Sequence, residues 1–343
     1  MLRGALAVIT ASLAFQLLLL RSQPAPRFVQ VAGNLFSLTQ WWAPIPGLPS
    51  CPVSVFLVRQ GGKEGSWALI DAGVGDSWHQ APGSQLLTAV QQSIPAGEHL
   101  AVIALTHTHF DHVGALPLLL GAYSGVEVVV HEVEQPYLIG SQTWAEEAAA
   151  NAGSKNWLLG GLLHWAARVG QQPVKVPAAR VHSLDARVPD LSPFGVFDLL
   201  WVATPGHSPG HVGFLHKPSH TLVAGDALTF LRPQLRRRRY SGSHDARLVR
   251  TFILPPPFPS LALIARPYTL CPPFICNKRE AQNAVCLLAD DALDYEGIYV
   301  AHDLAASRGG GWTKGKVQEL AGTMPACRQA VAHGDYMITA NAG

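Results

Sequence analysis

The sequence predicts an α/β (α+β) fold in four layers, an αββα sandwich in which two mixed β-sheets pack face to face with helices outside. Two observations predict this fold. Strand, helix and strand patterns alternate twice along the chain, and patterns of antiparallel hairpins lie between them. With 343 residues, of which 48% are hydrophobic, the chain is long enough to bury a substantial core.

The first half of the chain predicts one of the two sheets. Short Pro- and Gly-rich turns separate three strand patterns, which favours antiparallel pairing. These strands are expected at residues 28–38, 53–59 and 67–71. The alternating part follows, with a helix at 84–94, a strand at 102–105, a helix at 113–120 and a strand at 126–130. Residues 136–170 are rich in Ala and Trp and predict a helical excursion of the kind that shapes a pocket.

The second half of the chain predicts the other sheet. Strand patterns recur at residues 197–203, 212–215 and 221–224, and a helix over 278–293 precedes a strand at 298–301. Between them lies a Pro-rich segment, residues 232–273, with four consecutive arginines and little amphipathic pattern. We interpret this segment as a basic, Pro-rich insert or long loop.

The two ends of the chain differ from its body. An uncharged apolar run follows Arg3 and a Pro-rich break ends it, so residues 1–26 are predicted to be a signal peptide or a signal anchor. This predicts a place in the secretory pathway, either secreted or held at the membrane through this segment alone. Residues 27–330 are expected to form one domain and 331–343 a C-terminal tail. The net charge of +2 gives no case for a nucleic-acid partner.

The cysteines do not predict a disulfide scaffold. There are five of them, and no two form a Cys-x-x-Cys pair. Cys271 and Cys276 could bridge in an oxidising compartment, but buried free thiols are the default expectation for cysteines in this number.

The strongest chemical signal is the sequence Thr-His-Thr-His-Phe-Asp-His at residues 106–112, with four metal-competent side chains within six residues. It follows a predicted buried strand and leads into a predicted helix, so it lies on the kind of loop that often carries a functional site. Three imidazoles and a carboxylate crowded in this way predict a divalent cation. Imidazole and carboxylate suit zinc, iron(II) and manganese alike, so the residue types leave the metal open.

Three further predicted strands each end on a candidate ligand, namely His207, Asp226 and His302. Strand ends that converge on one edge of a sheet would gather these groups around the first cluster. Two alternatives stay open. His211, in His-Ser-Pro-Gly-His, competes with His207, and His244 competes with His302 because an aspartate follows each of them.

This order of residues resembles the metallo-β-lactamase fold superfamily, whose pattern is His-x-His-x-Asp-His, then His, Asp and His. The resemblance covers about residues 28–231 and 276–325 and implies two divalent metal ions, zinc in first place, with iron or manganese as alternatives. It implies that one ion is held by His107, His109 and His207, the other by Asp111, His112 and His302, and that Asp226 bridges them. Asp111 and Asp226 are also expected to serve catalysis.

Three residues are candidates for supporting the ligands without binding the ions, namely Asp71, His211 and Thr229. Asp71, in Leu-Ile-Asp-Ala-Gly, falls where the superfamily carries an acid near the site, although a turn or strand cap is an alternative role. His211 is the second candidate, because the strand pattern that begins there suggests a sheet residue beside the ligands.

Three short motifs are similar to the lactonase-type group of the superfamily. They are Thr-Pro-Gly-His-Ser-Pro-Gly-His at 204–211, Ala-Gly-Asp-Ala-Leu at 224–228 and Ala-His-Asp at 301–303. The resemblance implies a hydrolase in which a hydroxide activated by two metal ions opens a lactone or cleaves a small carboxylic ester. Thr229 stands where quorum-quenching lactonases carry a tyrosine, which leaves the identity of the small-molecule substrate open. The alternatives are a glyoxalase II-like thioesterase, a phosphodiesterase, and a metal-binding but catalytically impaired member of the superfamily.

Overall fold

The structure is a computed structural model. It describes residues 26–42, 51–61, 65–77, 80–144, 174–185, 187–228, 278–302, 311–322, 324 and 327. The predicted leader up to residue 25, most of the predicted helical excursion, the basic insert 232–273 and the tail 331–343 lie outside these residues. Among the helices in the described stretches, none combines the length and the apolar character needed to cross a membrane.

The first sheet has seven strands in the order β1-β2-β3-β4-β5-β6-β7. They are β1 (Val29–Ala32), β2 (Leu35–Trp42), β3 (Cys51–Arg59), β4 (Ser66–Ile70), β5 (His99–Ala104), β6 (Glu127–Val130) and β7 (Val181–Ser183). The pairs from β1 to β4 are antiparallel, as the short turns predicted, and the pairs from β4 to β7 are parallel. The sheet is therefore mixed.

The second sheet has six strands in the order β13-β12-β11-β10-β9-β8. They are β8 (Asp190–Leu191), β9 (Val196–Ala203), β10 (Val212–His216), β11 (Thr221–Val223), β12 (Gly297–Tyr299) and β13 (Trp312–Thr313). Its neighbours pair antiparallel except β11 and β12, which run parallel. This sheet is mixed as well.

Alternating side chains along the strands build the layers of the core. In β3, Val55 and Leu57 pack in the cluster on the helix side of the first sheet, whereas Phe56 and Val58 pack between the sheets. Such alternation is what the two-residue period of a strand imposes. Phe214 of β10 belongs to the same cluster as Phe56, and so the two sheets share one apolar interior.

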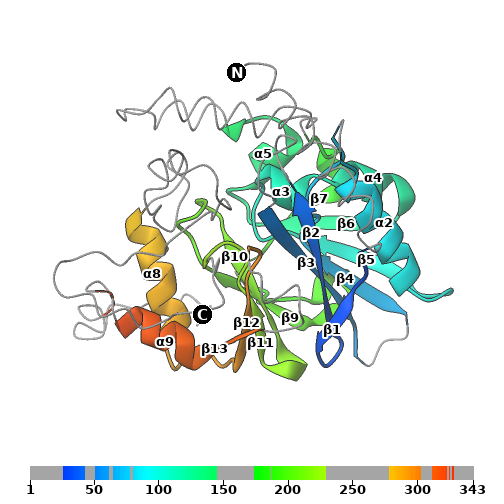
Figure 1. Cartoon of the computed structure of the whole chain (residues 1–343). Helices are drawn as coiled ribbons and strands as arrows, with labels where there is room; N and C mark the ends of the chain where they lie inside the picture. Colours follow the sequence, from blue (N-terminus) through cyan, green and yellow to red (C-terminus); the bar gives the residue numbers. More distant parts are fainter. Residues whose placement is uncertain are drawn as a thin grey trace, which may run out of the picture.

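The helices form the two outer layers (Figure 1). They are α2 (Pro82–Ser93), α3 (Phe110–Val113), α4 (Leu116–Ala122), α5 (Gln135–Ile139), α8 (Lys278–Ala289) and α9 (Lys314–Gly322), with short 3-10 helices at Ala178–Arg180, Ser192–Phe194 and Lys217–Ser219. Leu86 of α2 and Leu119 of α4 pack on the first sheet. Val285 of α8 and Val317 of α9 pack on the second sheet, on the opposite side of the molecule. The predicted αββα sandwich is confirmed.

Several predicted boundaries are wrong. The strand expected at 28–38 is a hairpin, because Gly33 adopts a positive φ of 52° and turns the chain between β1 and β2. The helix expected at 113–120 begins earlier, at Phe110, and is divided into α3 and α4. The strands β7, β8 and β13 have three residues or fewer, too short for a period-two pattern to show in the sequence.

The expectation of free thiols is wrong for two cysteines. Cys286 of α8 forms a disulfide with Cys327, which lies 41 residues further on and after α9. Both side chains are buried in the cluster that joins the helices to the second sheet. The disulfide therefore links α8 to the segment after α9 within the outer helical layer. Cys271 and Cys276 lie outside the described residues.

Candidate metal centre

The candidate ligands lie where strands of both sheets end. His107 and His109 occupy the loop between β5 and α3, and α3 begins directly after His109, so that Asp111 and His112 are on its first turn. Val223 of β11 pairs with Tyr299 of the parallel strand β12. Asp226 and His302 each follow three residues after these partners, and parallel strands therefore deliver both side chains to the same edge.

The side chains form two groups of potential ligands with one residue between them. His107, His109 and His207 make the first group, and Asp111, His112 and His302 make the second; within each, one ligand atom per residue lies within 4.8 Å of the others. Asp226 Oδ2 lies 3.2 Å from His207 Nε2 of the first group and 3.2 Å from His302 Nε2 of the second. The structure thus brings all seven predicted ligands together.

The nitrogen atoms of the first group fit a cation better than they fit one another. His109 Nδ1 lies 2.9 Å from His107 Nε2 and 2.9 Å from His207 Nε2. His109 Nδ1 carries at most one proton, so it cannot donate to both neighbours. Burial lowers the pKa of His107 and of His207 well below the usual range, which keeps both imidazoles neutral. Three neutral imidazoles with converging lone pairs are a zinc-type ligand set.

For the second group, buried polar atoms indicate that a cation would fit. His112 Nε2 and Asp226 Oδ1 are buried and have no hydrogen-bond partner among the described residues; the two atoms lie 3.7 Å apart. Buried polar atoms are normally paired. A divalent ion between these residues would satisfy both atoms, and the donor set therefore fits the two ions that the sequence predicted.

Asp71 orients the His112 ring by a hydrogen bond to its Nδ1 atom. Its Oδ2 accepts a hydrogen bond from His112 Nδ1 at 2.8 Å, and its Oδ1 accepts one from the Thr106 N–H at 2.8 Å. Burial lowers the pKa of His112, but the Asp71 and Asp226 carboxylates outweigh burial and raise the pKa to about 9. An ion that binds here must therefore displace the Nε2 proton of His112, while Nδ1 keeps its hydrogen bond to Asp71.

His302 is held in a similar way by the backbone of the first sheet. Its Nδ1 donates to the Pro52 carbonyl of β3 at 2.7 Å, which directs Nε2 to Asp111 Oδ2 at 3.3 Å. Burial lowers the pKa of His302, but the Asp226 and Asp111 carboxylates raise it well above the usual range. The competing His244 lies outside the described residues.

His211 lies beside the ligands but uses both of its ring nitrogens elsewhere. Nε2 accepts the N–H of Asp226 at 3.0 Å, and Nδ1 lies 2.8 Å from Thr204 Oγ1. The proton is therefore on Nδ1 and is donated to Thr204. Burial lowers the pKa of His211 to about 3. This geometry leaves no lone pair for a metal ion, and it is His207 that joins the first group.

Two features near the centre were missed from the sequence. Glu134, directly before α5, accepts hydrogen bonds from residues on both loops of the first group. Aromatic side chains also lie near the ligand loop: Trp144 packs edge-on against His109 at 4.8 Å between ring centroids, and Trp42 packs at 5.2 Å against Phe110, the residue after His109. The partners of each are distant in sequence, and no local pattern marks them. Thr229 lies outside the described residues.

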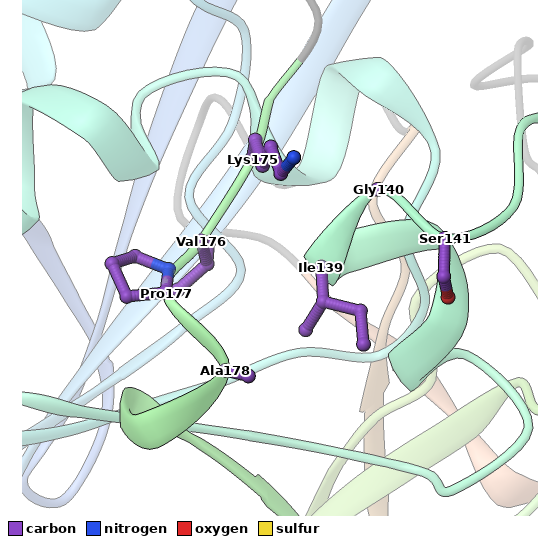
Figure 2. A pocket seen from close by; sticks show the side chains of 7 residues that line it. All are labelled: Ile139, Gly140, Ser141, Lys175, Val176, Pro177 and Ala178. Atoms are coloured by element: carbon purple, nitrogen blue, oxygen red, sulfur yellow. The ribbon is translucent and has the colours of Figure 1, made fainter.

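A cavity of about 570 Å³ lies near the end of α5 (Figure 2). Its lining is Ile139, Gly140, Ser141, Lys175, Val176, Pro177 and Ala178. Figure 2 shows Lys175 and Pro177 on the segment before the 3-10 helix at Ala178–Arg180, and Ile139 and Ser141 at and just after the end of α5. Lys175 is the one charged side chain in this lining, and none of the candidate ligands belongs to it. The cavity is therefore separate from the candidate metal centre.

Comparison with known sequences points to one family. The family model described as Metallo-beta-lactamase superfamily matches residues 48–249. Two proteins of Bacillus subtilis (strain 168) are similar to the chain. "Probable metallo-hydrolase YflN" is 31% identical over 186 residues, 54% of this chain and 64% of that protein. "Probable metallo-hydrolase YqgX" is 30% identical over 126 residues, 37% of this chain and 48% of that protein. The matches span less than two thirds of the length of either relative.

Comparison with solved structures points to the same fold. The metallo-beta-lactamase FIM-1 from Pseudomonas aeruginosa, crystallised in its mono-zinc form, aligns with a TM-score of 0.50 over 90% of this chain and 97% of that one. The two sequences are 12% identical. This likeness concerns the arrangement of sheets and helices.

Proposed function

The chain belongs to the metallo-beta-lactamase superfamily, and from its centre we propose that it is a metallo-hydrolase that opens a lactone or cleaves a small carboxylic ester. In this proposal His107, His109 and His207 hold one divalent ion, Asp111, His112 and His302 hold the other, and Asp226 lies between them. Zinc is the first choice of metal, with iron or manganese as alternatives.

One observation carries the proposal: Asp226 Oδ2 lies at 3.2 Å from a histidine of each group. A carboxylate in that place can join two ions into one centre. Divalent ions bound there would supply a water of lowered pKa and would polarise the carbonyl of the substrate. His112 and His302 contribute by keeping their Nδ1 protons on Asp71 and Pro52, so that Nε2 of each ring stays turned to the centre.

Asp111 is the carboxylate of the centre that is better placed to meet the attacking water. Its side chain is 15% exposed, whereas that of Asp226 is 5% exposed. Hydrogen bonds and charge from His302 and His112 overcome burial and lower the pKa of Asp111, which keeps the carboxylate ionised. We assign to it the orientation of the attacking water, from which an ionised carboxylate can accept a hydrogen bond.

The surroundings of the centre favour a carboxylic ester over a phosphodiester. Trp144, whose ring stacks on Tyr137, packs edge-on against His109, and Trp42 packs against Phe110, the residue after His109. Among the described residues, these aromatic side chains suit the acyl part of an ester or lactone, whereas recognition of a phosphodiester calls for basic side chains. The expected partner is therefore a small molecule rather than a nucleic acid.

The experiment is metal analysis followed by a substrate panel. Purified protein should contain about two divalent ions per chain, and it should hydrolyse lactones or esters in preference to thioesters and phosphodiesters. His109→Ala and Asp226→Ala should each lower kcat at least about a thousandfold. His182→Ala is the matched control, because His182 is half exposed and pairs with Glu127 on the surface. A folded protein that binds no metal, or full turnover by both variants, would contradict the proposal, and turnover of thioesters alone would shift it to a thioesterase.

We also propose that the protein works in the secretory pathway, outside the reducing cytosol. The disulfide between Cys286 and Cys327 supports this, because such bonds persist in oxidising compartments. Protein isolated from its own host should resist thiol labelling at both positions before reduction and accept two labels after it. Labelling of both thiols without reduction would place the protein in a reducing compartment.

A further inference from the structure

Glu134 is a fully buried carboxylate whose two oxygens each accept two hydrogen bonds. Oε2 accepts from the Thr108 N–H at 3.0 Å and from the Thr108 hydroxyl at 2.6 Å. Oε1 accepts from the Ser208 hydroxyl at 2.6 Å and from the Gly210 N–H at 3.0 Å. A buried carboxylate with four donors has its acceptor sites filled, and such charge-assisted bonds are the strong ones.

These donors lie on the two loops that carry the first group of ligands. Thr108 stands between His107 and His109, and Ser208 follows His207 directly. Glu134 thereby ties together loops that are about a hundred residues apart in the sequence. The hydrogen bonds found for its carboxylate in the described residues go to these two loops and not to α3 or to the loop of His302.

We propose that Glu134 is a positioning residue that sets the geometry of the first metal ion and leaves the second ion largely unaffected. This inference rests on the proposed two-metal centre. The nitrogens of His107, His109 and His207 must be brought together from both loops, and a residue that joins the loops decides whether they meet. Groups that orient ligands in this way commonly change metal affinity by 10- to 100-fold when they are removed.

The chemistry at this position requires a carboxylate. The N–H groups of Thr108 and Gly210 belong to the backbone and cannot turn away, and they approach opposite oxygens of the side chain. A glutamine has one acceptor oxygen and one NH2 group. Its NH2 group would face one of the two backbone N–H groups, so that a donor would meet a donor. The neighbouring hydroxyls can rotate and accept, but a backbone N–H cannot.

The packing around Glu134 is equally specific. A Cβ atom added to Gly210 would lie 2.7 Å from Glu134 Cγ, so the loop can approach this side chain only as glycine. On the other side, Trp144 Nε1 donates to the Thr108 carbonyl at 2.9 Å, and its ring stacks on Tyr137 of α5 at 3.8 Å. Residues 134–144 therefore bind Thr108 at its backbone N–H, its side-chain hydroxyl and its backbone carbonyl.

The test is a metal titration in which each group can be measured alone. His302→Ala removes a ligand of the second group and His107→Ala one of the first, so each parent reports mainly on the ion that remains. Metal-free proteins with and without Glu134→Gln are titrated with Co²⁺, followed by its visible absorption, and with Zn²⁺ in competition with a chromophoric chelator. Glu134→Gln should weaken the ion of the first group by about 10- to 100-fold and that of the second by less than about threefold.

Two further variants separate positioning from general stability. Gln60→Ala is the control, because Gln60 Oε1 also joins two elements by accepting the N–H groups of Phe197 and Asp198, away from the centre. It should lower stability without changing either metal affinity. Ser208→Ala removes one of the four hydrogen bonds and should give a smaller loss at the first ion, which decides the matter if Glu134→Gln does not fold.

The outcomes distinguish the two proposals. If the wild-type protein binds no metal, the proposed function fails. If the wild type binds two ions, three results would each show that Glu134 does not position the first ion. The first is wild-type affinity for the first ion in both Glu134→Gln and Ser208→Ala, and the second is an equal loss of affinity for both ions in these variants. The third is a loss at the first ion in Gln60→Ala that is as large as the loss in Glu134→Gln.

Discussion

Asp71 shows how one residue can serve both the backbone and the metal centre. Its φ is +61°, a conformation that aspartate and asparagine adopt more readily than most residues. Its carboxylate meanwhile accepts from the Thr106 N–H and from His112 Nδ1. The backbone needs a short polar side chain here, but the centre needs two acceptor oxygens.

This division predicts the effect of Asp71→Asn. Asparagine keeps the backbone conformation and one acceptor oxygen, but its NH2 group would face His112 Nδ1. The His112 proton would then move to Nε2, which removes the lone pair directed at the centre. We expect binding of one ion to weaken by about 10- to 100-fold with little loss of stability, measured by chelator competition. Asp198→Asn, at an aspartate that accepts the Gly61 N–H elsewhere, is the control. Equal affinities in all three proteins would refute this role.

His216 predicts a pH dependence that is separate from the metal centre. Its Nδ1 lies 2.6 Å from Ser219 Oγ, and its buried Nε2 has no hydrogen-bond partner in the part of the chain that the structure describes. Burial lowers its pKa below the usual 6.5, with Asp198 opposing in part. The unfolded chain therefore binds the proton more readily, so the stability that neutral His216 contributes is full above about pH 6.5 and is lost as the pH falls below it.

The variant His216→Asn should reveal this contribution. Its loss of unfolding free energy relative to the wild type should be larger at pH 7.5 than at pH 5.0, because only the wild type is destabilised by protonation of this ring. Urea unfolding at several pH values measures the difference. A constant difference between the two proteins over that range would contradict the prediction.

At the scale of elements, the loop after β4 is fastened to α3, the helix that carries Asp111 and His112. The Ala72 N–H donates to the His112 carbonyl at 2.7 Å, and the Gly114 N–H donates to the Gly73 carbonyl at 2.8 Å. A Cβ atom added to Gly114 would lie 2.1 Å from the Gly75 nitrogen. Both segments are backbone at this contact, so neither can yield as a side chain would.

This contact predicts that Gly114→Ala is costly although its φ is an ordinary −60°. We expect a loss of about 3 kcal/mol in unfolding free energy and weaker binding of metal by the second group, since α3 must move. Gly121→Ala is the matched control, because no atom of the described residues lies within 4 Å of a Cβ atom added to Gly121 in α4. There alanine should be neutral or stabilising by up to about 1 kcal/mol. Equal stabilities of the two variants would show that the loop adapts.

At the scale of the molecule, the centre depends on the packing of the two sheets. Its ligands come from the ends of β5, β9, β11 and β12, so each sheet contributes residues to it. The cluster that includes Phe56 and Phe214 fixes the distance between the sheets. The disulfide lies in the outer layer of the second sheet, where α8 and α9 pack. It supports the sheet from which Asp226 and His302 extend.

Removing this disulfide should lower the stability of the whole domain. Cross-linking positions 41 residues apart is worth about 4 kcal/mol in the chain-entropy model. We expect Cys286→Ser with Cys327→Ser to lose about 2–4 kcal/mol in denaturant unfolding while metal content stays the same. Unchanged stability, or a wild type that unfolds identically with and without reductant, would contradict the prediction.

The sequence predicted the layers, and the set of candidate ligands that lie together, better than it predicted the element boundaries and the residues that support those candidates. The long, periodic elements such as β9 and α2 were found because their burial repeats over several turns or strand residues. Strands such as β13, with two residues, have no repeat to read. Glu134 and the Cys286–Cys327 pair were missed for another reason. Their partners lie tens of residues away, and sequence spacing does not show which distant groups meet.

The sequence by itself determined that His107, His109, Asp111 and His112 lie together, because four ligands within six residues cannot be far apart. It also placed His207, Asp226 and His302 at the ends of apolar strands. Only the tertiary structure decided that these strand ends meet, that His211 turns both nitrogens away from the centre, and that Glu134 joins the two loops. The physical reason is that a local pattern fixes where a side chain leaves the backbone, whereas the packing of two sheets fixes which side chains share a space.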